Sequence, residues 1–541
     1  MKTIIKPLSI SFLAAYFLIA CGGGSSFVSA PLENIDTSPI KEAELTKAEL
    51  NKWSLLDLEK DTIPGMSVQK AYDELIKKKN GKTVIVAVVD SGTDIDHEDL
   101  DDNIWTNEDE IPNNGKDDDN NGYVDDIHGW NFVGDGYDEQ LEFVRIIVAG
   151  DKSAPRYDEA VQVYESEFKK FSGYKTQYDQ INQQLTFANE QLSKHFGKSD
   201  YTKEEVMALS TTDESLNQAK QIAQFMFNNG IDSMSEALKE ISDGLKSINE
   251  RLNVNLNKDL RGRKTGDDPN DLNDMPGYGN NNPRPSIKDE SHGTHVTGII
   301  AAERNNGIGM DGVANNVEIM AIRSTPNGDE YDKDVALAIR YAADNGAKII
   351  NASFGKSFSP NAEWVRDALK YAAEKDVLFV HAAGNDSDDI DIEPNFPNDA
   401  IGAGPEIADN VITVGALAPD YGSEMVSSFS NYGKVNVDVF APGTDVYSTM
   451  PENEYDLNSG TSMAAPNVAG VAALIRSQFP SLSAAQVKKV LMDSGLPIKT
   501  KVSVGEGETK STKSFSEISK SGRIVNAYNA LIMAARMVES M

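Results

Sequence analysis

Apolar and polar positions are arranged in two ways along this chain, and the first is a series of short runs that are mostly or wholly apolar. One run occupies residues 84–89 and ends at Asp90. Similar runs occupy residues 317–322, 347–352, 377–382 and 411–414, with helical patterns at 334–345 and 361–375 between them. A wholly apolar run is typical of a strand buried on both faces of a sheet. Strands that alternate with helices predict an α/β fold with a mostly parallel sheet and helices on both faces.

The second arrangement is a helical periodicity that interrupts this alternation between residues 140 and 262. Apolar residues recur every three or four positions from Tyr157 to Leu192 and again from Leu238 to Leu252. Such seams predict amphipathic helices, here paired as a helical hairpin or small bundle with a shorter helix near 216–227. We therefore predict a long helical insertion at 140–262. Its role is left open between a tolerated surface addition and a lid, a substrate-guiding arm or a partner-docking arm.

The first 80 residues have a different character again. An apolar stretch at 8–20 follows Lys2 and Lys6 and precedes Cys21, the one cysteine of the chain. This is the layout of a signal peptide, and the stretch is too short to span a bilayer as a stable helix. Leu18-Ile19-Ala20-Cys21 resembles a bacterial lipobox, which implies lipidation at Cys21; simple secretion is the alternative. We predict a lipoprotein signal peptide at 1–20 and a tether and amino-terminal strap at 21–80.

Net charge narrows the classes of partner. Asp and Glu number 85 against 51 Lys and Arg, a formal balance of −34. Such a chain repels phosphate backbones, so we expect no nucleic-acid binding.

Part of the acidic surplus is clustered in residues 117–126. Oxygen-bearing positions alternate there as in the first half of an EF-hand loop, which indicates a structural Ca²⁺ site. The predicted ligands are Asp117, Asp119, Asn121, the Tyr123 carbonyl and a closing acid, Asp125 or Asp126. His128 stands at the twelfth position of the loop, where an EF-hand has glutamate, so a merely charged turn is the alternative.

Three short strings carry the candidate chemistry. Asp90 ends the apolar run at 84–89, His292 lies in Ser291-His292-Gly293-Thr294-His295, and Ser462 lies in Gly460-Thr461-Ser462-Met463-Ala464. Hydrolysis by serine requires a hydroxyl, an imidazole that takes its proton and a carboxylate that orients the imidazole. Ser462 also begins an apolar, alanine-rich pattern at 462–479 that predicts a buried helix, whose positive end favours a nearby oxyanion. Zinc at His292 and His295 is disfavoured, because no acidic residue stands at an H-E-x-x-H spacing.

The order Asp, His, Ser within these strings resembles the subtilisin family over about residues 80–540, apart from the insertion. The resemblance implies a serine endopeptidase with 81–139 and 263–541 as its catalytic domain. The resemblance implies that Asp90 orients the imidazole of His292, that His292 acts as general base and then as general acid, and that Ser462 forms the acyl-enzyme.

Other strings resemble further parts of that family. Ala382-Ala383-Gly384-Asn385 is similar to the string of the oxyanion-hole asparagine, which implies that role for Asn385. Asn351-Ala352-Ser353-Phe354-Gly355 is similar to the substrate-pairing strand. The implied substrate-binding residues are Ser353, Phe354, Gly355, Ala383 and Gly384. Asp386, Asp388, Asp389 and Asp391 follow, and they suggest a basic residue before the scissile bond. Asp99 and the loop 305–309 are similar to a calcium site of the family.

The resemblance leaves several readings open. The expected substrates are extracytoplasmic polypeptides, and the expected location is a lipid anchor on a bacterial membrane, at the outer membrane or cell surface if there are two membranes. A processing protease with one dedicated precursor is as compatible with the sequence as a degradative one. The alternative from another class is a catalytically silent surface binding or scaffold protein that uses the insertion. Subtilisins carry an amino-terminal pro-domain, and residues 27–80 are shorter and more polar than one, so we expect either that maturation differs or that this chain folds without a pro-domain.

Overall fold

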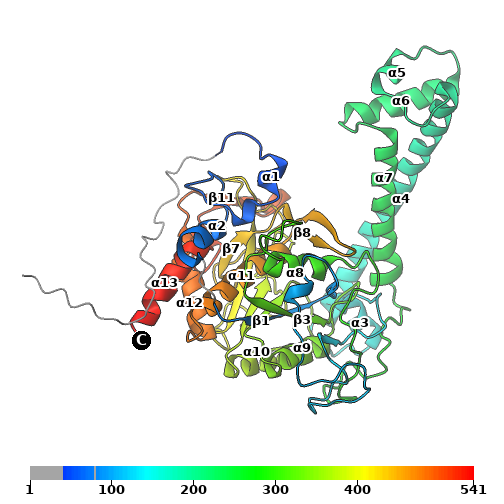
Figure 1. Cartoon of the computed structure of the whole chain (residues 1–541). Helices are drawn as coiled ribbons and strands as arrows, with labels where there is room; N and C mark the ends of the chain where they lie inside the picture. Colours follow the sequence, from blue (N-terminus) through cyan, green and yellow to red (C-terminus); the bar gives the residue numbers. More distant parts are fainter. Residues whose placement is uncertain (1–40, 78–80) are drawn as a thin grey trace, which may run out of the picture.

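The computed structural model describes residues 41–77 and 81–541, and its main body is built on one large sheet (Figure 1). Among the described residues, nine strands form this sheet in the order β10-β13-β7-β6-β5-β4-β1-β3-β2, and the β10–β13 pair alone is antiparallel. The strands are β1 (Val84–Asp90), β2 (Gly129–Asn131), β3 (Val317–Arg323), β4 (Ile349–Ala352), β5 (Leu378–Ala382), β6 (Val411–Leu417), β7 (Val439–Pro442), β10 (Leu496–Pro497) and β13 (Arg523–Ile524). The smaller pairs are β8 (Val446–Met450) with β9 (Glu454–Asn458), and β11 (Val502–Val504) with β12 (Ser511–Lys513).

Helices cover both faces of the sheet. One face packs against α8 (His292–Ala301), α11 (Thr461–Gln478), α12 (Ala484–Ser494) and α13 (Ala527–Glu539); the other packs against α9 (Asp332–Asp344) and α10 (Ala362–Glu374). An apolar core lies on each face of the sheet, and strand β1 contributes to both. Val86 and Val88 belong to the core on the first face, and Ala87 and Val89 belong to the core on the second. This alternation explains why the run at 84–89 is apolar throughout. The predicted α/β fold with a mostly parallel sheet is confirmed.

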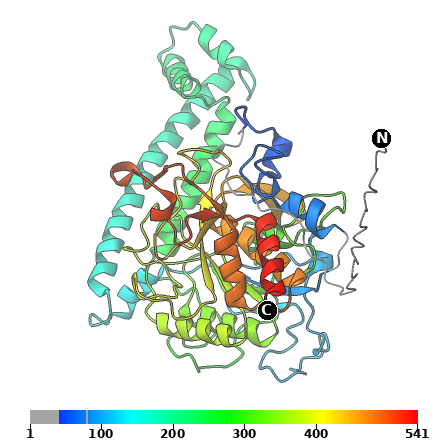
Figure 2. The same ribbon diagram turned by 90° about the vertical axis from the view of Figure 1, so that its left-hand side faces the viewer.

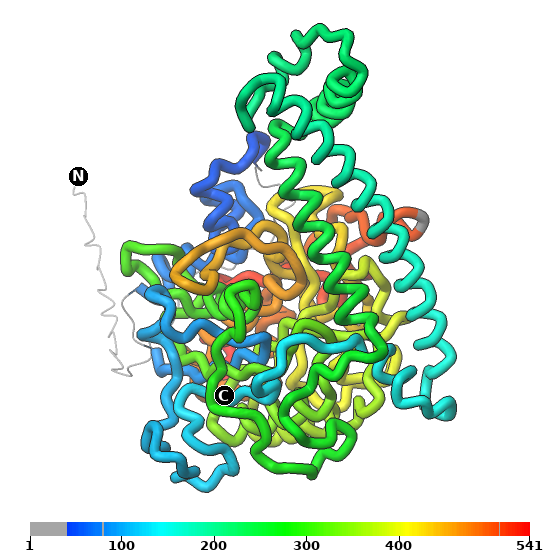
Figure 3. Tube along the Cα trace, turned by 90° about the vertical axis from the view of Figure 1, so that its right-hand side faces the viewer, coloured from blue at the N-terminus to red at the C-terminus, as the bar shows by residue number. Residues whose placement is uncertain are grey.

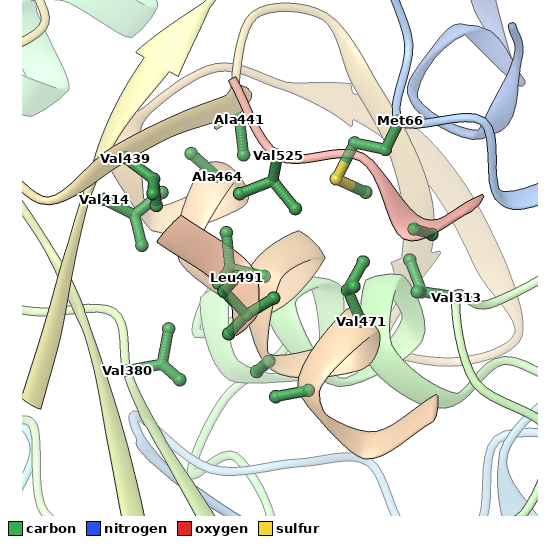
Figure 4. Close-up of a cluster of buried hydrophobic side chains, with 14 of the residues drawn as sticks. Met66, Val313, Val380, Val414, Val439, Ala441, Ala464, Val471, Leu491 and Val525 are labelled. Atoms are coloured by element: carbon green, nitrogen blue, oxygen red, sulfur yellow. The ribbon is translucent and has the colours of Figure 1, made fainter. Parts of the chain in front are cut away.

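The described part of the amino-terminal strap packs into the first of these cores. It contains α1 (Lys47–Leu50), η1 (Trp53–Leu55), α2 (Val68–Ala71) and η2 (Tyr72–Ile76). Trp53 is buried and its indole N–H donates to the carbonyls of Thr444 and Asp445, both at 3.1 Å. Met66 lies among Val313, Val471 and Val525 of the main core (Figure 4). The strap is therefore held by the same core as the sheet.

The predicted helical insertion projects from the body as a long arm (Figures 1 and 3). It comprises α3 (Glu142–Ala149), α4 (Tyr157–Phe196), α5 (Lys203–Ala208), α6 (Glu214–Asn228), α7 (Met234–Glu250) and η4 (Arg251–Asn255). Helices α4 and α7 run side by side, and the tip has an apolar core of its own that includes Leu192, Phe227 and Met234. The Leu141 N–H donates to the Asn255 carbonyl at 3.1 Å, so the two ends of the insertion meet at the body.

Short 3-10 turns at η3 (Asp101–Asn103), η5 (Gly507–Thr509) and η6 (Phe515–Glu517) complete the elements of the described chain. Within residues 41–77 and 81–541, the structure contains no helix with the length and apolar character needed to cross a membrane. The predicted signal peptide and Cys21 lie outside the described residues.

Candidate active site

Strand β1 and helix α8 bring Asp90 and His292 into direct contact. His292 Nδ1 and Asp90 Oδ1 are 2.7 Å apart, and the Ser91 N–H donates to the same oxygen at 2.7 Å. Asp90 is 1% exposed. The approach of the two elements depends on Gly293, where a Cβ would lie 2.2 Å from the Gly92 carbonyl oxygen. Glycine at this position lets the first turn of the helix pack on the end of the strand.

The environment of His292 changes its acidity. Burial opposes the protonated imidazole, but the charge of Asp90 and the hydrogen bond to it outweigh burial and raise the pKa of His292 above its ordinary value. His295 is different, because its Nε2 faces the Asp456 carbonyl at 3.2 Å and burial lowers its pKa to about 4. In the described chain neither histidine belongs to a group of three or more potential metal ligands. The two histidines therefore face separate partners.

Ser462 lies in the first turn of α11 and is tied to the end of β4. Its hydroxyl donates to the Ser353 carbonyl at 3.1 Å, and the Ser353 hydroxyl donates back to the Ser462 carbonyl at 2.8 Å. A serine hydroxyl has one proton, so it cannot donate to His292 in this rotamer. Ser462 and His292 nevertheless line the same cleft. Attack on a substrate by this arrangement requires the hydroxyl to leave Ser353 for the imidazole.

Asn385 is held in place by Thr461. The backbone N–H and the hydroxyl of Thr461 both donate to Asn385 Oδ1, at 2.8 and 3.0 Å. The Thr461 hydroxyl also accepts the Gly384 N–H at 3.0 Å. With its oxygen fixed in this way, the Asn385 amide turns Nδ2 to the opposite side. A Cβ placed on Gly460 would lie 3.5 Å from Asn385 Nδ2 and 3.6 Å from the Ser462 nitrogen, so these two donors converge on one region.

The cleft that contains these residues has a volume of about 490 Å³. The predicted site residues that line it are Asp90, His292, Ser462, Asn385, Ser353, Phe354, Gly355 and Gly384. Ala383 does not line it. Its side chain is fully buried and its carbonyl accepts the amides of Asn395 at 2.9 Å and Asn431 at 3.0 Å, so Ala382 takes its place in the wall.

The four aspartates after Asn385 divide into two pairs. Asp386 lines the cleft, and Asp386 and Asp388 both line a neighbouring groove. Asp389 lies 3.4 Å from Lys513, and Asp391 accepts backbone N–H groups of residues 435 and 436. Asp386 and Asp388 thus border the cleft or its neighbouring groove, whereas Asp389 and Asp391 make contacts that hold the loop, and Asp391 also lines a separate small cavity.

The insertion contributes walls to the cleft that the sequence pattern did not predict. Leu141 and Phe143 at its start and Arg251 near its end line the cleft beside Phe358. Phe143 and Phe358 belong to one small apolar core at the base of the arm. Thr461 was also missed, although the Gly-Thr-Ser string contains it. Its role depends on a contact with a residue 76 positions away, which no local pattern reveals.

The acidic loop at 110–126 gathers oxygen ligands. Carboxylate oxygens of Glu110, Asp119 and Asp126 all lie within 4.8 Å of one another, and the Asn121 amide donates to Asp119 at 3.0 Å and to Asp126 at 3.1 Å. Burial raises the pKa of Asp126 to about 6, with a further contribution from the charge of Asp119 and against hydrogen bonds from Tyr341 and Asn121. Buried carboxylates that repel one another, with oxygen donors alone, fit a hard divalent cation such as Ca²⁺.

Asp117 and Asp125, two further predicted ligands of this loop, accept backbone N–H groups. The Asp117 carboxylate accepts the N–H groups of Asn121 at 3.0 Å and Gly122 at 2.9 Å. Asp125 accepts the N–H groups of residues 114 and 115, so Asp126 is the acid that joins the cluster. The Tyr123 N–H donates to Asn121 Oδ1 at 2.8 Å. Glu110 was not predicted, because it precedes the EF-hand-like string and reaches the cluster only through the fold.

The second predicted calcium site, Asp99 with the loop at 305–309, is held together by hydrogen bonds. Asp99 accepts the Asn306 amide at 2.7 Å and the Met310 N–H at 3.1 Å. Burial raises the pKa of Asp99 against these hydrogen bonds.

A family model described as the Subtilase family matches residues 81–516. The chain is 45% identical over 189 residues to a thermophilic serine proteinase of Bacillus sp. (strain AK1), an alignment that covers 35% of this chain and 43% of that protein. It is 42% identical over 193 residues to thermitase of Thermoactinomyces vulgaris, with 36% of this chain and 63% of that protein covered. The chain therefore spans less than two thirds of the length of either relative.

One solved structure, of proteases from Pseudoalteromonas arctica PAMC 21717, matches 90% of this chain and 97% of its own. The identity is 21% and the TM-score is 0.45.

Proposed function

Because the chain belongs to the subtilase family, we propose that it is a serine endopeptidase that hydrolyses peptide bonds of extracytoplasmic proteins. The observation that carries the proposal is the cleft in which the Asp90–His292 pair, Ser462 and Asn385 lie together. These are the parts that acyl transfer by serine requires. A binding role has no use for all four.

The proposed reaction begins when the Ser462 hydroxyl turns from the Ser353 carbonyl to Nε2 of His292. Nε2 takes the proton while Oγ bonds to the carbonyl carbon of the substrate, whose oxygen becomes an oxyanion. Asn385 Nδ2 and the Ser462 N–H donate to that oxyanion. His292 then gives the proton to the departing amine, which leaves an ester on Ser462. Water, deprotonated by His292, attacks the ester carbonyl; the imidazole then gives that proton to Ser462 Oγ as the ester bond breaks, which releases the acid product and restores the serine. Asp90 accepts the hydrogen bond from His292 Nδ1 throughout and keeps the imidazole oriented.

Substrate binding is proposed to use the end of β4. Ser353, Phe354 and Gly355 line the cleft beyond Ser462, and an extended peptide can pair with their backbone as an added strand. Gly384 and Ala382 line the same cleft. This places the residues before the scissile bond along Ser353 to Gly355. We propose 81–139 and 263–541 as the catalytic domain and 140–262 as an insertion that adds walls to it.

A structural Ca²⁺ is proposed at Glu110, Asp119 and Asp126. When bound, the ion neutralises carboxylates that otherwise repel one another, and it stabilises the folded chain by mass action. It takes no part in the reaction.

The location is proposed from the amino-terminal sequence. Residues 1–20 have the layout of a lipoprotein signal peptide and Cys21 that of the acylated residue, so we propose export and a lipid anchor on a bacterial membrane. Residues 21–80 are the tether and strap.

Digestion of an unfolded protein tests the proposed activity. We expect the full chain to cleave reduced casein at internal bonds in calcium, and Ser462→Ala to leave it intact. Circular dichroism of both proteins checks the fold. If the folded parent cleaves neither casein nor a library of unstructured peptides, the protease assignment fails. The alternative, a surface scaffold that acts through the arm, then becomes the leading reading.

A further inference from the structure

A second groove opens from the catalytic cleft and runs along the base of the arm. It has a volume of about 430 Å³ and lies between α4 and the loop at residues 386–395. The two cavities share Phe143, Arg251, Ser357, Phe358, Asp386 and Asn395 in their walls. The lower part of α4 runs beside the body in both side views (Figures 2 and 3). The groove therefore adjoins the cleft at these shared residues, on the side where Ser357 and Phe358 continue the chain from Gly355.

The wall formed by the arm is fixed to the loops of the cleft. Arg145 donates to the carbonyls of Asp329 at 2.8 Å and Glu330 at 3.0 Å, and the Glu142 N–H donates to the Asp329 carboxylate at 2.7 Å. At the start of α4, Arg156 donates to the Ser357 carbonyl. These bonds anchor the arm at the point where the two cavities meet. The groove is thus built into the fold.

Charges on the two walls are balanced differently. On the arm, Arg156 pairs with Glu159, and Glu167 lies 3.1 Å from Arg251 and 3.5 Å from Lys170. The opposite wall carries the carboxylates of Asp386, Asp388 and Glu393. In the part of the chain that the structure describes, no Lys or Arg pairs with these three.

The carboxylate wall is electrostatically strained and bordered by apolar surface. Burial and the charges of Asp386 and Glu393 raise the pKa of Asp388. A cation between them would relieve this repulsion. Val163, Phe171, Ile390 and Pro394 line the same groove. Apolar surface beside carboxylates suits Lys and Arg side chains, which bury a hydrocarbon stem and present a charged end.

We propose that this groove is an extended subsite for the substrate, and that it selects Lys or Arg several residues before the scissile bond. The inference rests on the proposed function. In this proposal the arm takes part in substrate selection. The loop at 386–393 binds substrate residues that lie several positions before the scissile bond.

Peptides of matched sequence test the proposal on the full chain. All share the residues around the scissile bond; one group has an amino-terminal extension with two Lys, a second has the same extension with two Glu, and a third has no extension. We expect kcat/KM to be roughly fivefold higher for the Lys extension than for the Glu extension, and the ratio to fall with salt. Asp388→Asn with Glu393→Gln should bring the ratio close to one and leave the unextended peptide unaffected.

Two further variants make the test specific. Asp367→Asn with Glu374→Gln removes the same charge from α10, outside both cavities, and should keep the parent ratio. Val163→Lys puts a cation on the arm wall and should abolish the preference for Lys. Cleavage of the unextended peptide confirms that each variant is folded.

Each outcome decides between the two proposals. If unextended peptides are cleaved but both extensions behave alike in the parent, the groove is not a subsite and the protease assignment stands. If Val163→Lys keeps the parent ratio, the arm is not a wall of the site. If no peptide is cleaved, the proposed function fails. Anisotropy of the labelled Lys and Glu peptides with Ser462→Ala then tests the groove by binding alone, and equal affinities overturn it.

Discussion

The hydroxyl and the backbone N–H of Thr461 both donate to Oδ1 of Asn385, at 3.0 and 2.8 Å. Through these two bonds the residue before the candidate nucleophile orients the side chain that is proposed to hold the oxyanion. Replacing Thr461 by valine removes the hydrogen bond from its hydroxyl and changes the shape of the side chain little. Such a variant tests the orientation of Asn385 without altering the reacting groups themselves.

Thr461→Val is expected to lower kcat by roughly fivefold with little change in KM, because a neutral hydrogen bond of about 1 kcal/mol no longer fixes the Asn385 amide, and the Gly384 N–H loses its acceptor as well. Asn385→Ala should cost more, roughly 10²–10³-fold, as loss of the equivalent donor does in subtilisin. Steady-state kinetics of both variants check this. In the double variant the Thr461 substitution should have almost no further effect; a full additional loss would show that Thr461 acts elsewhere.

Asp90→Asn is expected to shift the pH profile as well as the rate. His292 must be neutral to accept the Ser462 proton, and Asp90 raises the pKa of His292, so the acidic limb of kcat/KM should lie above the ordinary histidine value. Without the Asp90 charge, burial alone acts on His292, and the limb should move to lower pH while turnover falls roughly 10⁴-fold. Profiles between about pH 5 and 9 measure both effects. An unshifted limb would contradict the Asp90–His292 coupling.

Calcium is expected to stabilise the chain more at neutral than at acidic pH. The folded pKa of Asp126, about 6, lies above its ordinary value, so the stability that this group contributes without metal is present below its unfolded pKa and is lost as pH rises through about 6. Bound calcium offsets that loss, by roughly 2.7 kcal/mol at a hundredfold excess over Kd.

Thermal unfolding with calcium and with chelator, at about pH 5 and pH 7.5, measures this effect. The gain in Tm should be larger at the higher pH and should disappear in Asp126→Asn. Glu374→Gln, an exposed change on α10, is the control and should keep the full gain. A calcium effect that survives in Asp126→Asn would assign it to another site, with the loop around Asp99 as the first candidate.

Cys21→Ser is expected to release the protein from the membrane. A thioether-linked lipid at Cys21 would place the parent in the detergent phase of a Triton X-114 separation, and the variant in the aqueous phase. Metabolic labelling with a palmitate analogue provides a second measurement. Labelling of the serine variant equal to that of the parent would exclude Cys21 as the lipidated residue.

Much of the fold could be predicted from the sequence, because its strands and helices have strong local patterns. The run at 84–89 is apolar throughout since its residues face two cores, and the pattern at 334–345 corresponds to α9 within two residues at each end. The helical seams of the arm were equally clear because its apolar stripe repeats over many turns.

The remainder depends on contacts between distant residues. Glu110 belongs to the acidic cluster but lies outside residues 117–126, the segment from which the cluster was predicted. Phe143 and Arg251 line the cleft from opposite ends of the insertion. The Ser462 rotamer is set by the Ser353 carbonyl, 109 positions away. Ala383 was predicted as a wall residue, but the chain turns at Gly384 and buries Ala383 behind the wall. Local patterns carry no information about any of these.

Ser462 is expected to be an activated nucleophile, and reaction with a fluorophosphonate probe tests this most directly. We expect the full chain in calcium to be labelled on Ser462, as identified by peptide mass spectrometry, and Ser462→Ala to remain unlabelled. Asp90→Asn should be labelled far more slowly. Absence of labelling in the folded parent, or equal labelling of the parent and Ser462→Ala, would contradict the account.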